Sequence, residues 1–126
     1  MKADRQKVGK RGESEACEYL ISEGHTILER NWRGGHLEID IITLDGRGIH
    51  FVEVKSRTAP VSADPILNVG YIKQKRLTAA ALSYLHSPAA KRLEENEVFF
   101  DVVTVVFDSG STRIEYYPQA FLPLYV

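Results

Sequence analysis

Residues 98–107 form an almost uninterrupted run of apolar, β-branched and aromatic side chains, and this run restricts the fold more than any other segment. Only Asp101 and Thr104 interrupt it. A short apolar run without period-two alternation is typical of a central strand that is covered on both faces. The sequence therefore predicts an α/β fold with this segment inside the sheet.

Hydrophobic spacing and turn residues predict the elements around this segment. In chain order we expect a helix over 4–23, strands over 25–32, 37–44 and 49–57, a helix over 69–87, and strands over 98–107 and 112–117. Pro88 either ends the second helix or opens a short further one to residue 95. The strand–helix–strand unit over 49–107 predicts a right-handed crossover with parallel strands. The expected fold is a mixed sheet flanked by helices, in the order α-β-β-β-α-β-β.

Residues 37–57 form a predicted β-hairpin in which each strand carries a carboxylate among apolar residues. If the turn centres on Gly46-Arg47, Asp40 faces Glu53, whereas a bulge would shift this register by one residue. Carboxylates directly opposite each other destabilise a sheet, and burial without partners adds to that cost. A hard cation such as Mg²⁺ compensates them through oxygen ligands. The hairpin therefore predicts a metal site at Asp40 and Glu53.

Two further groups extend this predicted site. Lys55 shares a strand face with Glu53 and faces Glu38 in this register, where it would orient a water or neutralise charge on phosphorus. Glu13 lies about 20° from Leu20 around its helix at ~100° per residue, so it belongs to the inward stripe. Each group alone also fits a simpler role, as a surface ion pair, a solvated edge pair or an acid at the rim of the core. Their combination favours a metal site.

Other polar residues carry weaker signals. Asp101 is expected to pair with an arginine of a helix, with a supporting role at the site as the alternative. Gln74 and Lys73, early in the second helix, would reach a phosphate if that helix abuts the site. The four histidines share no metal-ligand spacing, and we expect His36 or His50 on a strand surface.

Positive charge is concentrated in the first three quarters of the chain, although the net charge is −1. Residues 1–93 carry 15 Lys and Arg against 11 acids, and residues 94–126 carry one against six. Clustered bases form a phosphate-binding face without a high overall pI, although the solvated faces of two helices are an equally simple interpretation. The candidates for nucleic-acid contacts are Lys7, Lys10, Arg11, Arg57, Lys73 and Lys75.

Length and composition set further bounds. A chain of 126 residues, 44% hydrophobic and 26% charged, suits a single domain over 1–126. Cys17, the one cysteine, excludes an internal disulfide, is expected in the core and suits a reducing compartment. No apolar run approaches a membrane span and no secretory leader follows Met1, so we expect a cytoplasmic protein without a membrane partner.

Several short motifs together resemble a known family. They are Gly9-x-x-Gly12-Glu13, Arg30-Asn31-x-Arg33, Glu38-Ile39-Asp40-Ile41-Ile42, Phe51-Val52-Glu53-Val54-Lys55-x-Arg57, Lys75 with Ala80-Ala81, Phe100-Asp101-Val102-Val103 and Ala120-Phe121. Asp40 with Glu53-Val54-Lys55 resembles the core of the PD-(D/E)XK, or restriction-endonuclease-like, nucleases. More narrowly, nearly the whole chain resembles the YraN family of predicted endonucleases, which are similar to archaeal Holliday-junction resolvases.

The resemblance implies a restriction-endonuclease-like fold, metal ligation by Asp40 and Glu53, a catalytic Lys55, and support from Glu13 and Glu38. Two positions depart from the family pattern. Leu37 stands where a glycine usually precedes the residue matching Glu38. Phe99 stands where an arginine often precedes the Phe-Asp pair, which removes one partner for Asp101.

These observations lead to one main hypothesis and two alternatives. The main one is a Mg²⁺- or Mn²⁺-dependent endodeoxyribonuclease that tracks the DNA backbone without reading sequence, with branched DNA as a substrate by analogy. The first alternative is a nucleic-acid-binding module of the same fold without cleavage, and the second is a protein-interaction domain with a vestigial site. Junction cleavage would also require a homodimer. Its surface would be formed by Val69, Tyr71 or the apolar tail 121–126, with packing of these residues on the domain as the alternative.

Overall fold

The structure, a computed structural model, describes residues 2–61 and 69–122. Its elements are α1 (Lys2–Ser22), β1 (Thr26–Gly34), β2 (Leu37–Leu44), β3 (Gly48–Thr58), α2 (Tyr71–Leu85), the 3-10 helix η1 (Pro88–Leu93), β4 (Glu97–Asp108) and β5 (Ser111–Phe121). The predicted elements are thus confirmed, with Pro88 opening a short helix. The predicted loop over 58–68 and the apolar tail lie partly outside the described residues, since 62–68 and 123–126 are not described.

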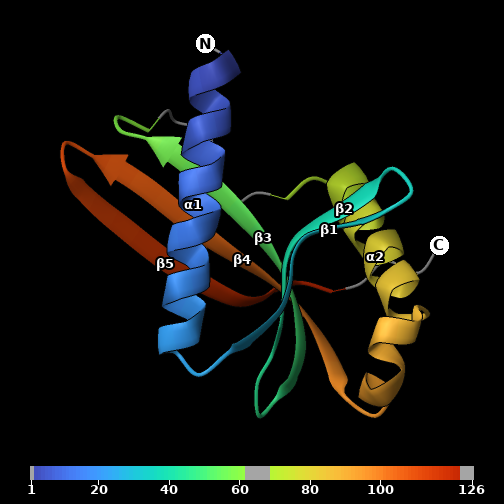
Figure 1. Cartoon of the computed structure of the whole chain (residues 1–126). Helices are drawn as coiled ribbons and strands as arrows, with labels where there is room; N and C mark the ends of the chain where they lie inside the picture. Colours follow the sequence, from blue (N-terminus) through green and yellow to red (C-terminus); the bar gives the residue numbers. More distant parts are fainter. Residues whose placement is uncertain (1, 62–68, 123–126) are drawn as a thin grey trace.

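The five strands form one mixed sheet in the order β1-β2-β3-β4-β5 (Figure 1). β3 and β4 are parallel and the other neighbours are antiparallel, so the predicted α/β fold is confirmed. β5 is four residues longer than expected at its end, because an edge strand accommodates Pro118, which cannot donate to a ladder.

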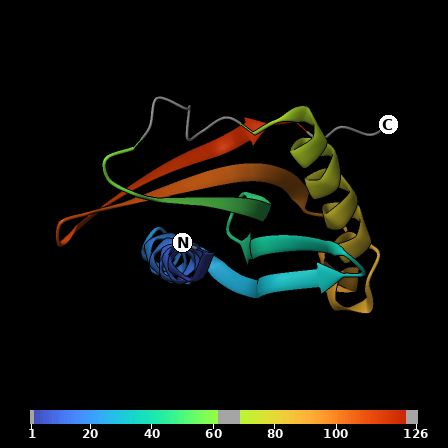
Figure 2. The ribbon, with the colours of Figure 1, turned by 90° about the horizontal axis from the view of Figure 1, so that it is seen from above.

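α1 and α2 pack on opposite faces of the twisted sheet (Figures 1 and 2). The core under α1 joins Cys17 and Leu20 to inward residues of the central strands such as Val52, and Cys17 is buried there as expected. The core under α2 includes Tyr84 and Phe51. β4 lies between these two cores, which explains its continuous apolar run.

The ladder between β2 and β3 stops halfway along the strands. It pairs Ile41–Leu44 with Ile49–Val52 in the register predicted from the Gly46-Arg47 turn. The predicted pairs Asp40–Glu53 and Glu38–Lys55 are absent from this ladder, because the part of β2 that precedes Ile41 lies away from β3 (Figure 1). β1 stays paired with β2, and β4 with β3, along their lengths. The sheet therefore divides into a β1–β2 ribbon and a β3–β4–β5 sheet, and we call this division the fork.

α1 approaches β3 closely beside the fork. A Cβ added to Gly12 would lie 1.7 Å from Ser56 Oγ, so a larger residue would push the helix off the strand. Glycine at this position therefore sets the distance between α1 and β3, and with it the position of the neighbouring Glu13.

Across the described segments, no helix has the length and apolarity that a membrane span requires.

Candidate functional site

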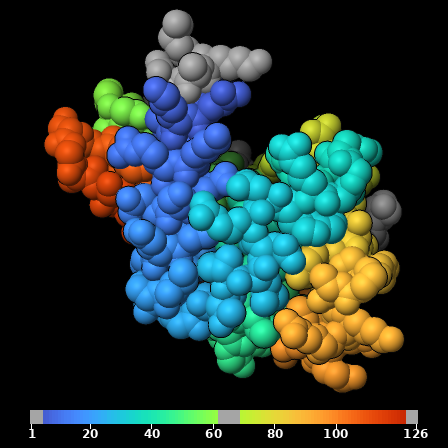
Figure 3. All heavy atoms as spheres, viewed as in Figure 1, coloured from blue at the N-terminus to red at the C-terminus, as the bar shows by residue number. Residues whose placement is uncertain are grey.

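A cleft lies at the fork, between α1 and the strands that separate there (Figure 3). Its volume is about 760 Å³. The residues that line it are Arg5, Val8, Gly9, Glu13, Asp40, Glu53, Val54, Ser56, Arg57 and Thr58. Three carboxylates from three different elements therefore meet in one cavity, and these are the three predicted metal ligands. We call this cavity the carboxylate cleft.

Asp40 takes over a backbone contact where the ladder ends. Its Oδ2 accepts a hydrogen bond of 2.8 Å from the Val54 N–H, in place of a carbonyl of β2. Burial raises the pKa of Asp40 well above the ordinary carboxyl value, and the hydrogen bond and negative charge shared with Glu53 raise it further. The Val54 N–H opposes this shift only in part. Without a cation, the two carboxyls thus favour keeping a proton between them.

Glu53 is the most buried acid of the cleft, with 9% of its side chain exposed. Its Oε2 is buried and has no hydrogen-bond partner. Lys73 Nζ of α2 lies 3.3 Å from this oxygen, an ion-pair distance without a hydrogen bond. A buried carboxylate oxygen without a donor has a high desolvation cost, which a bound cation would remove.

Glu13 faces the cleft from α1, as its helical position predicted, and it is half-buried. Burial raises the pKa of Glu13, and a hydrogen bond with Asn31 and the charge of Arg30 offset this only in part. Asn31 belongs to β1 and has a φ of 50°, a conformation that asparagine tolerates better than most residues. Sequence reasoning had matched Asn31 to a motif without giving it this role.

Lys55 is half-buried on β3 two residues beyond Glu53, and it is not among the residues that line the cleft. Burial lowers the pKa of Lys55, and the positive charges of Arg57 and Lys73 add to this effect, while Glu53 opposes it. An amine with a lowered pKa gives up a proton more readily.

Glu38 and Gln74 lie apart from the three carboxylates. Glu38 is exposed, lies 3.5 Å from Arg33 across the β1–β2 ribbon, and borders a smaller cavity together with Lys73. Gln74 donates a hydrogen bond of 2.7 Å to the Val69 carbonyl in front of α2. Its amide nitrogen is thus committed to holding the start of α2.

The predicted nucleic-acid contacts divide into two groups. Arg57 lines the cleft from β3, and Arg5 of α1 faces it from the other side. Lys7, Lys10 and Arg11 are exposed on α1 outside the cleft, and the Arg11 guanidinium lies 4.2 Å from the centre of the Phe107 ring. Lys73 pairs with Glu53, and Lys75 Nζ lies 5.6 Å from the centre of the Tyr71 ring.

Asp101 corrects a prediction, because its partner is a histidine and not an arginine of a helix. Its Oδ2 accepts hydrogen bonds from His50 Nδ1 at 2.6 Å and from the Tyr116 hydroxyl. Its Oδ1 accepts one from the Gln119 N–H at 2.9 Å. His50 was expected as a candidate for a strand surface, but it is buried and its ring stacks on Phe99. Phe99, the residue before Phe100, thus packs on the histidine that pairs with Asp101.

The fold and the carboxylate cleft together define a mixed α/β protein with three acids gathered where its sheet divides. Residues 12–105 match the family described as "Uncharacterised protein family UPF0102". The chain belongs to the UPF0102 family, which confirms the predicted YraN membership.

Relatives in this family align with nearly the whole chain. A UPF0102 protein of Geobacter metallireducens is 40% identical over 121 residues, which cover 96% of this chain and 97% of the relative. One of Syntrophus aciditrophicus is 44% identical over 115 residues, covering 91% and 88%. One of Anaeromyxobacter dehalogenans is 38% identical over 117 residues, covering 93% and 85%.

Proposed function

We propose that the protein is a Mg²⁺- or Mn²⁺-dependent endonuclease that hydrolyses phosphodiester bonds of DNA in the carboxylate cleft. The observation that carries this proposal is the meeting of Glu13, Asp40 and Glu53, with one buried Glu53 oxygen that lacks a hydrogen bond. Three acids with oxygen donors suit a hard divalent cation better than any other common ligand. The resemblance of Asp40 and Glu53-Val54-Lys55 to the PD-(D/E)XK core supports the same chemistry.

Each residue of the chain has a distinct role in this proposal. Asp40, Glu53 and Glu13 would hold the cation, which when bound polarises the phosphate and lowers the pKa of water. Lys55 would orient the attacking water or, when protonated, stabilise negative charge on the phosphate. Burial lowers the pKa of Lys55 and so favours the neutral amine, which suits the first of these roles. Arg5 and Arg57, which line opposite sides of the cleft, would contact phosphates next to the bond that is cut.

The decisive experiment compares cleavage of linear, flap and four-way-junction DNA in the presence of Mg²⁺, Mn²⁺ or EDTA. We expect cutting with either metal and none with EDTA. Asp40→Asn, Glu53→Gln and Lys55→Met should each lower the rate by about 10²–10³-fold, the usual effect of losing one group that stabilises transition-state charge. Glu18→Gln, an exposed position of α1, is the matched control and should cut like wild type. Equal cutting by all these proteins would identify a contaminating nuclease and refute the proposal.

A second candidate function is DNA binding without cleavage. The observation that favours it is that Lys55 does not line the cleft, whereas Arg5 and Arg57 do. A binding module would retain DNA with a strong dependence on salt concentration. Arg57→Gln would reduce the slope of log affinity against log salt by about one, because one phosphate contact is lost. Binding of this kind, with no metal-dependent product on any of the DNA substrates, would select the binding module over the nuclease.

A further inference from the structure

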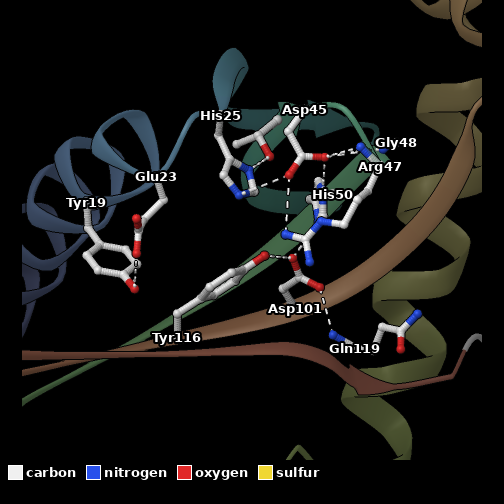
Figure 4. Close-up of polar contacts among 11 residues, drawn as sticks. Tyr19, Glu23, His25, Asp45, Arg47, Gly48, His50, Asp101, Tyr116 and Gln119 are labelled. Carbon is white, nitrogen blue, oxygen red and sulfur yellow. Dashed lines mark hydrogen bonds and ion pairs between the residues drawn. The ribbon is translucent and has the colours of Figure 1, made fainter.

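We propose a second metal site, of the Zn²⁺ type, formed by His25, Asp45 and His50 at the closed end of the β2–β3 hairpin. These residues come from the position just before β1, the hairpin turn and β3, and each offers one ligand atom within 4.8 Å of the others (Figure 4). Asp45 lies five residues along the chain from Asp40, about 16 Å at the rise of a strand. The proposed site is therefore separate from the carboxylate cleft.

The two imidazoles are oriented as metal ligands usually are. His25 Nδ1 lies 2.7 Å from Thr43 Oγ1, and His50 Nδ1 lies 2.6 Å from Asp101 Oδ2. With Nδ1 engaged in this way, the Nε2 atom of each ring faces Asp45, and such Nδ1 partners of ligating histidines fix the ring orientation. Both Nε2 atoms lie near the same carboxylate, at 3.5 Å from Asp45 Oδ2 for His25 and 2.8 Å from Asp45 Oδ1 for His50.

The carboxylate between the imidazoles is also held in place. Asp45 Oδ1 accepts hydrogen bonds from the N–H groups of Arg47 at 2.9 Å and Gly48 at 3.3 Å. The rings of His25 and His50 pack with their centres 4.7 Å apart, and each histidine side chain is only 1% exposed. The three ligand groups thus keep their places without large rearrangement on binding.

Solvent reaches the cluster from the side of Asp45. Its side chain is 11% exposed. The side chain of Arg47 is 59% exposed, and its guanidinium lies 3.3 Å from Asp45 Oδ2. A cation would compete with this guanidinium for the carboxylate, and the long arginine side chain can move into solvent.

The donor set selects a different metal from the one expected in the cleft. Two imidazole nitrogens and one carboxylate oxygen suit Zn²⁺, whereas all-oxygen sites suit Mg²⁺ and Mn²⁺. Three protein ligands leave the fourth position of a tetrahedral Zn²⁺ to water. The competing interpretation is a metal-free ion pair, in which His50 donates from both ring nitrogens to Asp45 and Asp101.

The test is a titration of the chelator-treated full chain with Zn²⁺, followed by the ¹⁵N NMR signals of the imidazoles. We expect one Zn²⁺ per chain to shift the Nε2 signals of His25 and His50, while the exposed His36 and His86 stay unchanged. Unchanged Nε2 signals of His25 and His50 at one equivalent would leave the ion pair as the correct description and overturn the proposal. This measurement uses the wild-type fold, so it holds even if a variant fails to fold.

Variants then assign the ligands. His25→Gln and Asp45→Asn should each weaken Zn²⁺ binding at least about tenfold in competition with a zinc indicator, the lower end of losses seen even for residues that only support a ligand. His36→Gln is the matched control, and Asp40→Asn should leave this binding unchanged because it alters only the cleft. Zn²⁺ affinity that falls with Asp40→Asn and not with His25→Gln would place the ion in the cleft and overturn the proposal.

Discussion

The two ends of the β2–β3 hairpin hold buried carboxylates in opposite electrostatic settings. At the closed end, Asp45 and Asp101 are surrounded by N–H and O–H donors and share the imidazole of His50 between them. At the fork, Asp40 and Glu53 face each other, and the protein supplies one backbone N–H and one lysine. The acids of the closed end thus have partners within the chain, whereas the chain supplies fewer donors to the two acids at the fork.

This difference distinguishes acids that have a structural role in the fold from acids that are available to bind a ligand. The buried acids of the closed end have partners, whereas burial without enough partners at the fork has a cost that a bound cation or a shared proton would offset. The pKa shifts agree with this distinction. Burial raises the pKa of Asp45, but the hydrogen bonds from His50 and the Arg47 N–H outweigh it and lower the pKa overall. Burial and Glu53 together raise that of Asp40.

The largest effect on stability is expected from Asp101→Asn. The amide would turn a donor toward His50 and Tyr116, and loss of one partner of a buried charge pair typically costs about 3–5 kcal/mol. Urea unfolding followed by circular dichroism measures this change. Asp108→Asn, at the exposed end of the same strand, is the control and should shift the midpoint little. Coincident midpoints for Asp101→Asn and wild type would remove the contrast between the two ends.

Gly12→Ala tests the packing that places Glu13 at the fork. The added methyl collides with Ser56 Oγ, and overpacking of this kind costs about 1–3 kcal/mol. Gly9→Ala is the matched control, because nothing lies within 4 Å of its Cβ position and alanine favours a helix by about 1 kcal/mol. The two alanines should therefore change the melting temperature in opposite directions. Ser56→Gly should restore the Gly12→Ala protein, and failure of this rescue would show that the collision is not the cause.

Asp40→Asn should stabilise the metal-free protein, the opposite sign to Asp101→Asn. Because the folded-state pKa of Asp40 is raised, its contribution to folding is full below the ordinary carboxyl pKa and is lost as the pH rises toward the folded value. Asparagine does not titrate, so the gain over wild type should grow with pH above about 4, by at most about 1.4 kcal/mol per pH unit. Urea midpoints in EDTA across this pH range measure the gain.

Asp45→Asn provides the opposite pH profile. The folded-state pKa of Asp45 is lowered, so its contribution is present at neutral pH and disappears as the pH falls below the ordinary carboxyl value. The deficit of Asp45→Asn should therefore shrink in acid. Parallel pH profiles for the two variants would contradict the comparison between the two ends.

The smallest effect is expected from Lys73→Met. Lys73 is 48% exposed, and ion pairs with solvent access contribute about 0.2–1 kcal/mol. Thermal melts should show a small decrease, with Lys91→Met, on the exposed surface of η1, as the control. A decrease as large as that of Asp101→Asn would mean that Lys73 compensates the buried carboxylates at the fork and would contradict the comparison.

Local patterns predicted much of the fold and part of the site. Alternation and the Gly46-Arg47 turn determine the hairpin register, because a short turn leaves few alternatives. Helical spacing was enough to place Glu13 inward. The fork was not predictable in this way, since the side-chain pattern of β2 continues unchanged past Asp40 while its backbone leaves β3. Nor did the pattern predict the close approach of α1 to β3 at Gly12 beside the fork, a contact between distant segments.

The His50–Asp101 pair escaped sequence reasoning for a related reason. The two residues are 51 positions apart and meet through the parallel register of β3 and β4, in which His50 lies beside Phe99. A crossover through a helix leaves that register open, whereas a tight turn does not. Sequence reasoning gave no role to Asp45, which precedes the predicted Gly46-Arg47 turn, although it lies five residues before His50.

Because of the fork, the sheet consists of two parts, the β1–β2 ribbon and the β3–β4–β5 sheet, which one short ladder joins. The backbone ladder that joins the two parts is confined to Ile41–Leu44 and Ile49–Val52, while the ladders inside each part extend along the strands, with one irregularity in β1–β2 and one in β4–β5. A change in the distance between the ribbon and the sheet can therefore bend this short ladder and leave every other strand pair intact. The carboxylates lie where the two parts separate, and the histidine cluster lies at the other end of the ladder that joins them. The opening of the carboxylate cleft thus depends on the β2–β3 hydrogen bonds, whereas other hydrogen bonds hold the strands of each part together.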